Sequence, residues 1–204
     1  MSTKKSIGAL ELSSVGIGYQ IEDTMLKAAS VDLLIARTIC SGKYLIVVGG
    51  LVSDVQAAMD AGLTASDEAI IDQLVLPNVH ESVFPALGQS VVLSPGEAGA
   101  LGVLETFSGT SALAAADAAA KAARITIFRI HVAMALGGKG IVLMTGGVAD
   151  VRAGVPAGAE AARGPGQLVS ELVIARPHLA LFPDYLSRDC LIEILVAWTV
   201  SGAV

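Results

Sequence analysis

The sequence has little of what secreted, nucleic-acid-binding or membrane-spanning proteins need. Its 204 residues include two cysteines, Cys40 and Cys190, too few for a disulfide framework. The 13 lysines and arginines are scattered and the net charge is −6, so no basic surface for nucleic acid is indicated. The longest apolar run, near the C-terminus, is shorter than the roughly 20 residues that span a bilayer. We therefore expect neither a nucleic-acid partner nor a membrane.

Signals for export and for common catalytic chemistry are also missing. Residues 1–5 lead directly into an alternating segment instead of a long apolar region, so we expect the chain to stay in the cytoplasm. The glycine-rich stretches at 8–10 and 49–50 do not have the spacing of a nucleotide-binding loop. There is no HExxH or CxxC motif and no Ser-His-Asp order, so no enzyme is indicated. Charged residues make up 16% and hydrophobic residues 53%, which favours a surface that contacts other subunits.

What the sequence does contain is a long internal repeat. Segments of the first half return 94 to 98 positions later, and the drift in spacing indicates two small insertions in the second copy. The matching pairs are 7–11 with 101–105, 23–29 with 117–123, 42–43 with 138–139, 54–55 with 150–151, 61–62 with 157–158, and 74–76 with 172–174. The repeat predicts two domains, 6–87 and 100–186, joined by a linker at 88–99. The tail at 187–204 has no counterpart and no assigned role.

Within each copy the pattern is strand, helix, two strands, helix, strand and short helix. In the first copy it predicts strands at 7–12, 31–39, 44–48 and 74–76, and helices at 17–29 and from Val52 to Gly62. Gly62 is expected to end the second helix and Pro77 the last strand. A βαββαβ order indicates an α+β fold whose helices cover one face of a mostly antiparallel sheet.

These features together resemble the bacterial microcompartment shell domain. The resemblance is carried by the sequence Asp-Thr-Met-Leu-Lys-Ala-Ala at 23–29, by Gly42-Lys43 after the second strand, and by Gly49-Gly50 before a helix. It covers both copies, so the chain is similar to the tandem-domain shell proteins. The resemblance implies a trimer of two-domain chains that forms a pseudohexameric tile in the shell, next to other microcompartment shell proteins.

The two copies differ most clearly at Cys40. The sequence Thr-Ile-Cys-Ser-Gly-Lys at 38–43 is most similar to the cluster-carrying shell proteins of propanediol-utilisation microcompartments. This resemblance implies that Cys40 is a metal ligand for one [4Fe-4S] cluster per trimer. It also implies electron transfer across the shell, with a lumenal redox enzyme as a further partner. A cluster needs several thiolates, and a cyclic trimer would bring three copies of Cys40 together, whereas 132–138 in the second copy offers none.

Other interpretations of these segments stay open. The central loop implied by the resemblance contains Ile39, Ser41, Gly42, Gly137 and Gly138. Without a cluster, this loop would line a pore for small metabolites. An enzyme or small-molecule sensor built on the same repeat is a third possibility. The ordinary role of a lone cysteine is that of a small buried residue, which is the interpretation favoured for Cys190.

Lysines and histidines that recur in both copies are further candidates. The resemblance places Lys27 and Lys121 at tile edges, where they would contact neighbouring tiles. The alternative is a weak surface pair with the aspartate four residues earlier in each helix. Recurring His80 and His178 have no carboxylate or cysteine at recurring spacing, which favours capping or packing over metal binding. His131 lies close to the expected central loop in the second copy.

Overall fold

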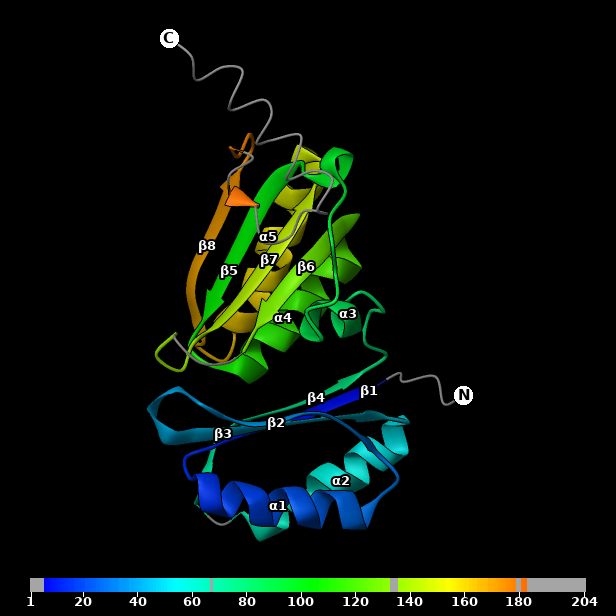
Figure 1. Cartoon of the computed structure of the whole chain (residues 1–204), viewed down its shortest axis with the longest axis vertical. Helices are drawn as coiled ribbons and strands as arrows, with labels where there is room; N and C mark the ends of the chain where they lie inside the picture. The colour runs from blue at the N-terminus through cyan, green and yellow to red at the C-terminus, as the bar shows by residue number, and fades with distance from the viewer. Residues whose placement is uncertain (1–5, 67, 133–135, 179–180, 183–204) are drawn as a thin grey trace.

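The computed structural model describes residues 6–66, 68–132, 136–178 and 181–182. Each repeat copy forms one four-stranded sheet, and two long helices cover one face of each sheet (Figure 1). The predicted α+β class and the tandem βαββαβ organisation are confirmed.

The first half contains seven regular elements. Its sheet, sheet 1, has the order β2-β3-β1-β4, and every neighbouring pair is antiparallel. The elements are β1 (Ser6–Leu12), α1 (Val15–Ala28), β2 (Asp32–Ile39), β3 (Lys43–Gly50), α2 (Val52–Ala65), β4 (Ile70–Pro77) and α3 (Val83–Leu87). The polar Ser14 side chain accepts a hydrogen bond from the Ile17 N–H and so fixes the start of α1.

The second half repeats this topology. Its sheet, sheet 2, has the order β6-β7-β5-β8. The elements are β5 (Ala100–Thr106), α4 (Gly109–Ala122), β6 (Ile125–His131), β7 (Gly140–Gly146), α5 (Val148–Arg163) and β8 (Leu168–Ile174). Register shifts between Leu33 and Ile35 and between Ile127 and Arg129 stand at equivalent places, so the two copies agree even in their irregularities.

Two boundaries differ from the prediction by three residues or more. Strand β4 begins at Ile70, four residues before the predicted start, although Pro77 ends it as expected. Gly62 does not end α2, which continues to Ala65. A Cβ atom at Gly62 would lie 2.8 Å from the Met25 side chain, so this glycine permits the close approach of α1 and α2.

Sheet 1 is covered on both faces. Leu10 and Leu12 of β1 pack in the core under α1 and α2. Ile7 and Ala9, which point to the opposite face, pack in a core shared with the second half. All seven residues of β1 are buried as a result. Figure 1 shows this arrangement, with α1 and α2 on one side of the sheet and α3 and α4 on the other.

The helix-to-sheet contacts of the two halves are filled by different side chains. In the first half, the buried Tyr44 ring lies against Gly18 of α1, where a Cβ atom would be 2.4 Å from the ring. In the second half, Gly140 replaces the tyrosine and Ala112 replaces the glycine, with 2.6 Å between the Ala112 methyl and a Cβ built at Gly140. From the first half to the second, bulk has therefore moved from the strand to the helix, and the contact stays close-packed in both.

Adding one methyl group at Gly18 should therefore disrupt the first half. We expect Gly18→Ala to destabilise the protein by about 1–3 kcal/mol, because the buried Tyr44 ring cannot move away freely. Gly16→Ala is the matched control in the same helix, since no atom lies within 4 Å of its Cβ position. Thermal unfolding followed by circular dichroism would measure both. Equal melting temperatures for the two variants would contradict this packing.

Candidate functional site

The loop that carries Cys40 is a single tight turn. β2 ends at Ile39, one 3₁₀ turn spans Cys40–Gly42, and β3 begins at once. Ser41 and Gly42 both have left-handed backbone conformations, with φ of 66° and 73°. Cys40 is half-buried, while Ser41 and Gly42 are exposed. Ile39 is only 3% exposed and packs in the shared core, so its side chain does not lie on the loop surface.

The second copy places its own loop beside this turn. Residues 133–135 of that loop lie outside the described residues, but Gly137 and Gly138 are described and have φ of 62° and 86°. A Cβ atom at Gly138 would lie 3.2 Å from Lys43 Nζ and 3.9 Å from the carbonyl oxygen of Cys40. The segments that the sequence grouped as a central loop therefore meet within one chain.

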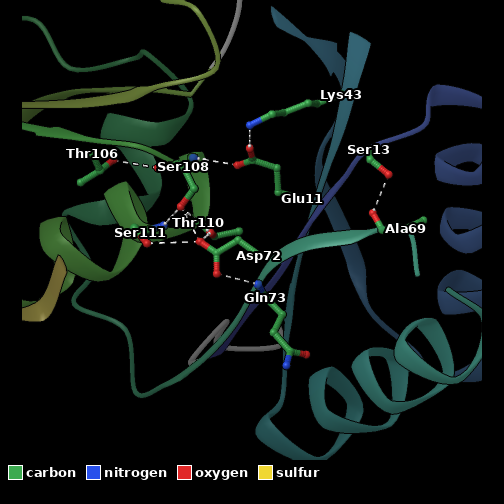
Figure 2. Close-up of polar contacts among 11 residues, drawn as sticks. Glu11, Ser13, Lys43, Ala69, Asp72, Gln73, Thr106, Ser108, Thr110 and Ser111 are labelled. Carbon is green, nitrogen blue, oxygen red and sulfur yellow. Dashed lines mark hydrogen bonds and ion pairs between the residues drawn. The ribbon is translucent and has the colours of Figure 1, made fainter. Parts of the chain in front are cut away.

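A lysine–glutamate pair lies next to each loop. Lys43 Nζ is 2.8 Å from Oε1 of Glu11, whose side chain is fully buried, and the N–H of Gly109 donates to the other carboxylate oxygen at 2.9 Å (Figure 2). In the second copy, Lys139 Nζ is 2.8 Å from Oε1 of Glu105. The sequence analysis did not pair these residues, although both the glutamate and the lysine recur in the repeat.

The junction between the halves is centred on Asp72 of β4. Its carboxylate Oδ2 accepts hydrogen bonds from the hydroxyls of Ser108, Thr110 and Ser111 at the start of α4 (Figure 2). A carboxylate at this end of a helix is also favoured by the helix dipole. Its counterpart in the second copy is Ser170, which donates to Glu105 at 3.1 Å. The difference between Asp72 and Ser170 was the sequence feature from which this junction could have been predicted.

Lys27 and Lys121 lie in the last turns of α1 and α4, away from these contacts. Each binds the aspartate one turn earlier, Asp23 at 2.6 Å and Asp117 at 2.5 Å. The Asp23 side chain is 61% exposed, whereas that of Asp117 is 6% exposed and also accepts the N–H of His80 at 2.8 Å. His80 also contacts Ser82 through its ring, in keeping with the predicted packing role.

The pKa values of Glu105 and Tyr44 are clearly shifted. The hydrogen bond from Lys139 lowers the pKa of the Glu105 carboxyl, although burial opposes it, and Ser170 assists. Burial raises the pKa of the Tyr44 phenol, and the Glu22 carboxylate, which accepts its hydrogen bond at 2.8 Å, raises it further. Tyr44 therefore stays neutral and links β3 to α1 at physiological pH.

The described part of one chain does not contain a complete metal site. No group of three or more His, Cys, Asp and Glu side chains is placed to hold an ion among the described residues. Cys40 forms no disulfide with them, and Cys190 lies outside them. In the same residues, no helix is long and apolar enough to cross a bilayer. A site at Cys40 that needs several thiolates would thus require other chains.

The buried Glu11 carboxylate should depend strongly on Lys43. We expect Lys43→Met to destabilise the protein by about 3 kcal/mol or more, because an uncompensated charge would remain buried. Adding Glu11→Gln should recover part of the loss, since glutamine has no charge and still accepts the Gly109 N–H. Urea unfolding of both variants would measure this. A double variant less stable than the single variant would contradict it.

The Glu105–Lys139 pair should make stability depend on pH. A carboxyl whose pKa is lowered by folding stabilises the protein above its unfolded value of about 4.3, and the stabilisation disappears as pH falls through the folded value. Lys139→Met should therefore lower the urea midpoint at pH 7 and lower it less at pH 3. Lys27→Met is the control, since its pair is exposed and should have little effect at either pH. A constant Lys139→Met effect would contradict this assignment.

Comparisons with known proteins agree with this geometry. The family model described as the BMC domain matches twice, at residues 6–79 and 100–177. The bacterial microcompartment shell protein PduT of Citrobacter freundii is 42% identical over 178 residues, which cover 87% of this chain and 96% of that protein. The shell protein EutM of Escherichia coli K12 is 42% identical over 93 residues, 44% of this chain and 94% of that protein.

A solved structure has the same two-domain arrangement. The chain superposes on a microcompartments protein from Desulfitobacterium hafniense with a TM-score of 0.81 and 41% sequence identity, over 88% of this chain and 98% of that one. The superposition thus extends over both domains of this chain. The chain therefore belongs to the BMC-domain family and is a bacterial microcompartment shell protein with two such domains in tandem.

Proposed function

We propose that this chain is a structural tile of a microcompartment shell, closed as a trimer, with Cys40 of each chain binding one [4Fe-4S] cluster on the three-fold axis. Each chain supplies two similar domains, so three chains supply the six positions of a pseudohexagon. Other shell proteins would then be its neighbours in the shell. The relatives are named as shell proteins, which supports a structural role instead of a catalytic one.

The placement of Cys40 is the observation that carries the cluster proposal. The thiol stands on a turn between two strands, half-exposed, and the carbonyl of the same residue lies near the loop of the second copy. If the loops of both copies surround the axis, each chain contributes one thiolate and one loop without cysteine. Three thiolates are one fewer than the four that usually hold such a cluster, which leaves one iron for another ligand.

Residues around Cys40 suit a negatively charged group. Ser41 and Gly42 are consecutive left-handed residues, and turns of this kind can direct backbone N–H groups towards anions and sulfur atoms. Lys43 follows directly and lies near the loop of the second copy, with its charge balanced by Glu11. A bound cluster would supply one-electron transfer across the tile, with a lumenal redox enzyme as the partner on one side.

A second candidate function follows from the small residues of the same loops. Ser41, Gly42 and Gly137 are exposed and carry almost no side chain. Without a cluster, these loops would border an opening through which small metabolites could pass. This alternative keeps the shell tile and changes only what its centre does.

Iron content separates the two candidates. After anaerobic isolation or reconstitution, we expect about four irons per trimer and, once the protein is reduced with dithionite, an iron–sulfur EPR signal in the native chain, because three thiolates would then hold one cluster. Cys40→Ala should lose both, whereas Cys190→Ala should keep both. A native trimer that stays iron-free after reconstitution would exclude the cluster and leave the metabolite opening.

A further inference from the structure

A polar cavity lies where the two halves of the chain meet at the end of α4. It has a volume of about 360 Å³ and is bordered by His80, between β4 and α3, and by residues 120–125, which lead from α4 into β6. The first half therefore supplies one wall of the cavity and the second half the other. The volume lies in the range of sites for small molecules, roughly 300–1,000 Å³.

The ionisable side chains that border the described part of this cavity are all basic. They are His80, Lys121 and Arg124. Asp117 lies close by, but both of its oxygens are occupied, because Oδ1 accepts the N–H of His80 at 2.8 Å and Oδ2 binds Lys121. Lys121, in the last turn of α4, also offsets the negative end of the helix dipole. The cavity therefore favours a negatively charged ligand.

Two of the basic groups have donors that are not used within the chain. The N–H of Ser82 donates to Nδ1 of His80 at 3.3 Å, so Nδ1 is an acceptor and the proton of the neutral ring lies on Nε2. Neither this Nε2 nor the Arg124 guanidinium has a partner among the residues that the structure describes. Asp117, by contrast, already holds the backbone of His80 and the Lys121 side chain in place.

The arginine distinguishes this place from its counterpart in the other copy. Lys27 corresponds to Lys121 and has the same pairing with an aspartate one turn earlier. Ser30, however, stands where the second copy has Arg124. The arginine is therefore not a general feature of the repeated fold, and it belongs to the junction inside one chain.

We propose that this cavity binds the phosphate group of a small molecule through Arg124, Lys121 and Nε2 of His80. Arginine presents a planar fork that can bond two oxygens, lysine adds a compact positive charge, and the imidazole N–H reaches a further oxygen. A tetrahedral phosphate has enough oxygens for these donors, whereas a carboxylate has only two. A phosphate group also carries about −1.5 to −2 charges at pH 7, which matches the two cations.

A bound phosphate would connect His80 of the first half to Arg124 of the second and so stabilise the junction. Lys121 is also expected at a tile edge, so the ligand would reduce the positive charge that this edge presents to a neighbouring tile. The site requires neither the cluster nor the trimer, because one chain supplies every residue that borders it.

Calorimetric titration at fixed ionic strength tests the site, with inorganic phosphate and glycerol 3-phosphate as the two probes. We expect saturable binding to the native chain. Arg124→Ser should weaken it at least tenfold, because the substitution removes the planar fork and one charge. Arg124→Lys should restore part of the affinity. Arg152→Ser is the matched control, since Arg152 is an exposed arginine of α5 that does not border the cavity.

The tighter of the two probes distinguishes free phosphate from a phosphorylated metabolite as the ligand. Thermal unfolding gives a second readout, in which the probes should raise the melting temperature of the native chain and of Arg152→Ser more than that of Arg124→Ser. An equal rise in potassium chloride of the same ionic strength would show screening alone and overturn the site. Absence of saturable binding, or equal affinity of Arg124→Ser and Arg152→Ser, would also overturn it and leave the shell tile unaffected.

Discussion

The packing of α4 between the two sheets is the contact on which the rest of the structure depends. It buries the outer face of sheet 1, joins the cores of the two halves and fixes the angle between them. Asp72 and Glu11 of the first domain accept hydrogen bonds from groups at the start of α4. The junction is therefore polar at one end and apolar along its length. Because Lys43 balances Glu11 next to the loop of the second copy, the same contact also positions both loops.

Much of the fold could be predicted from the sequence because the same pattern of strands and helices occurs twice in the chain. The α+β class, the element order and the turn at Cys40 were all evident from strand and helix periodicity. The end of α2 was predicted wrongly, because a buried glycine that permits helix contact has the same local pattern as one that ends a helix. The start of β4 was missed because Ile70 and Ile71 precede Asp72, which interrupts the apolar pattern.

The candidate site was less predictable than the fold. Cys40, Gly137 and Gly138 were identified through the resemblance to the tandem shell proteins, and the structure brings the two loops together. The ion pairs beside them join residues about 30 positions apart, and the pairing of β1 with β3 and of β5 with β7 places them together. Ile39 was grouped with the loop by its position, but strand alternation turns its side chain into the core.

Duplication also allows the two junctions of a tile to differ, which six identical chains could not achieve. The internal junction can use a carboxylate and hydroxyls, because its two sides are covalently tethered and need no help in finding each other. On the proposed tile, a junction between chains would have to form from solution, and burial of apolar surface is the main force that drives such association. On the proposed tile, the same divergence leaves three of six central loops with a thiol. The contacts that assemble the tile and the thiols at its centre would thus both result from the divergence of the two copies at a few positions.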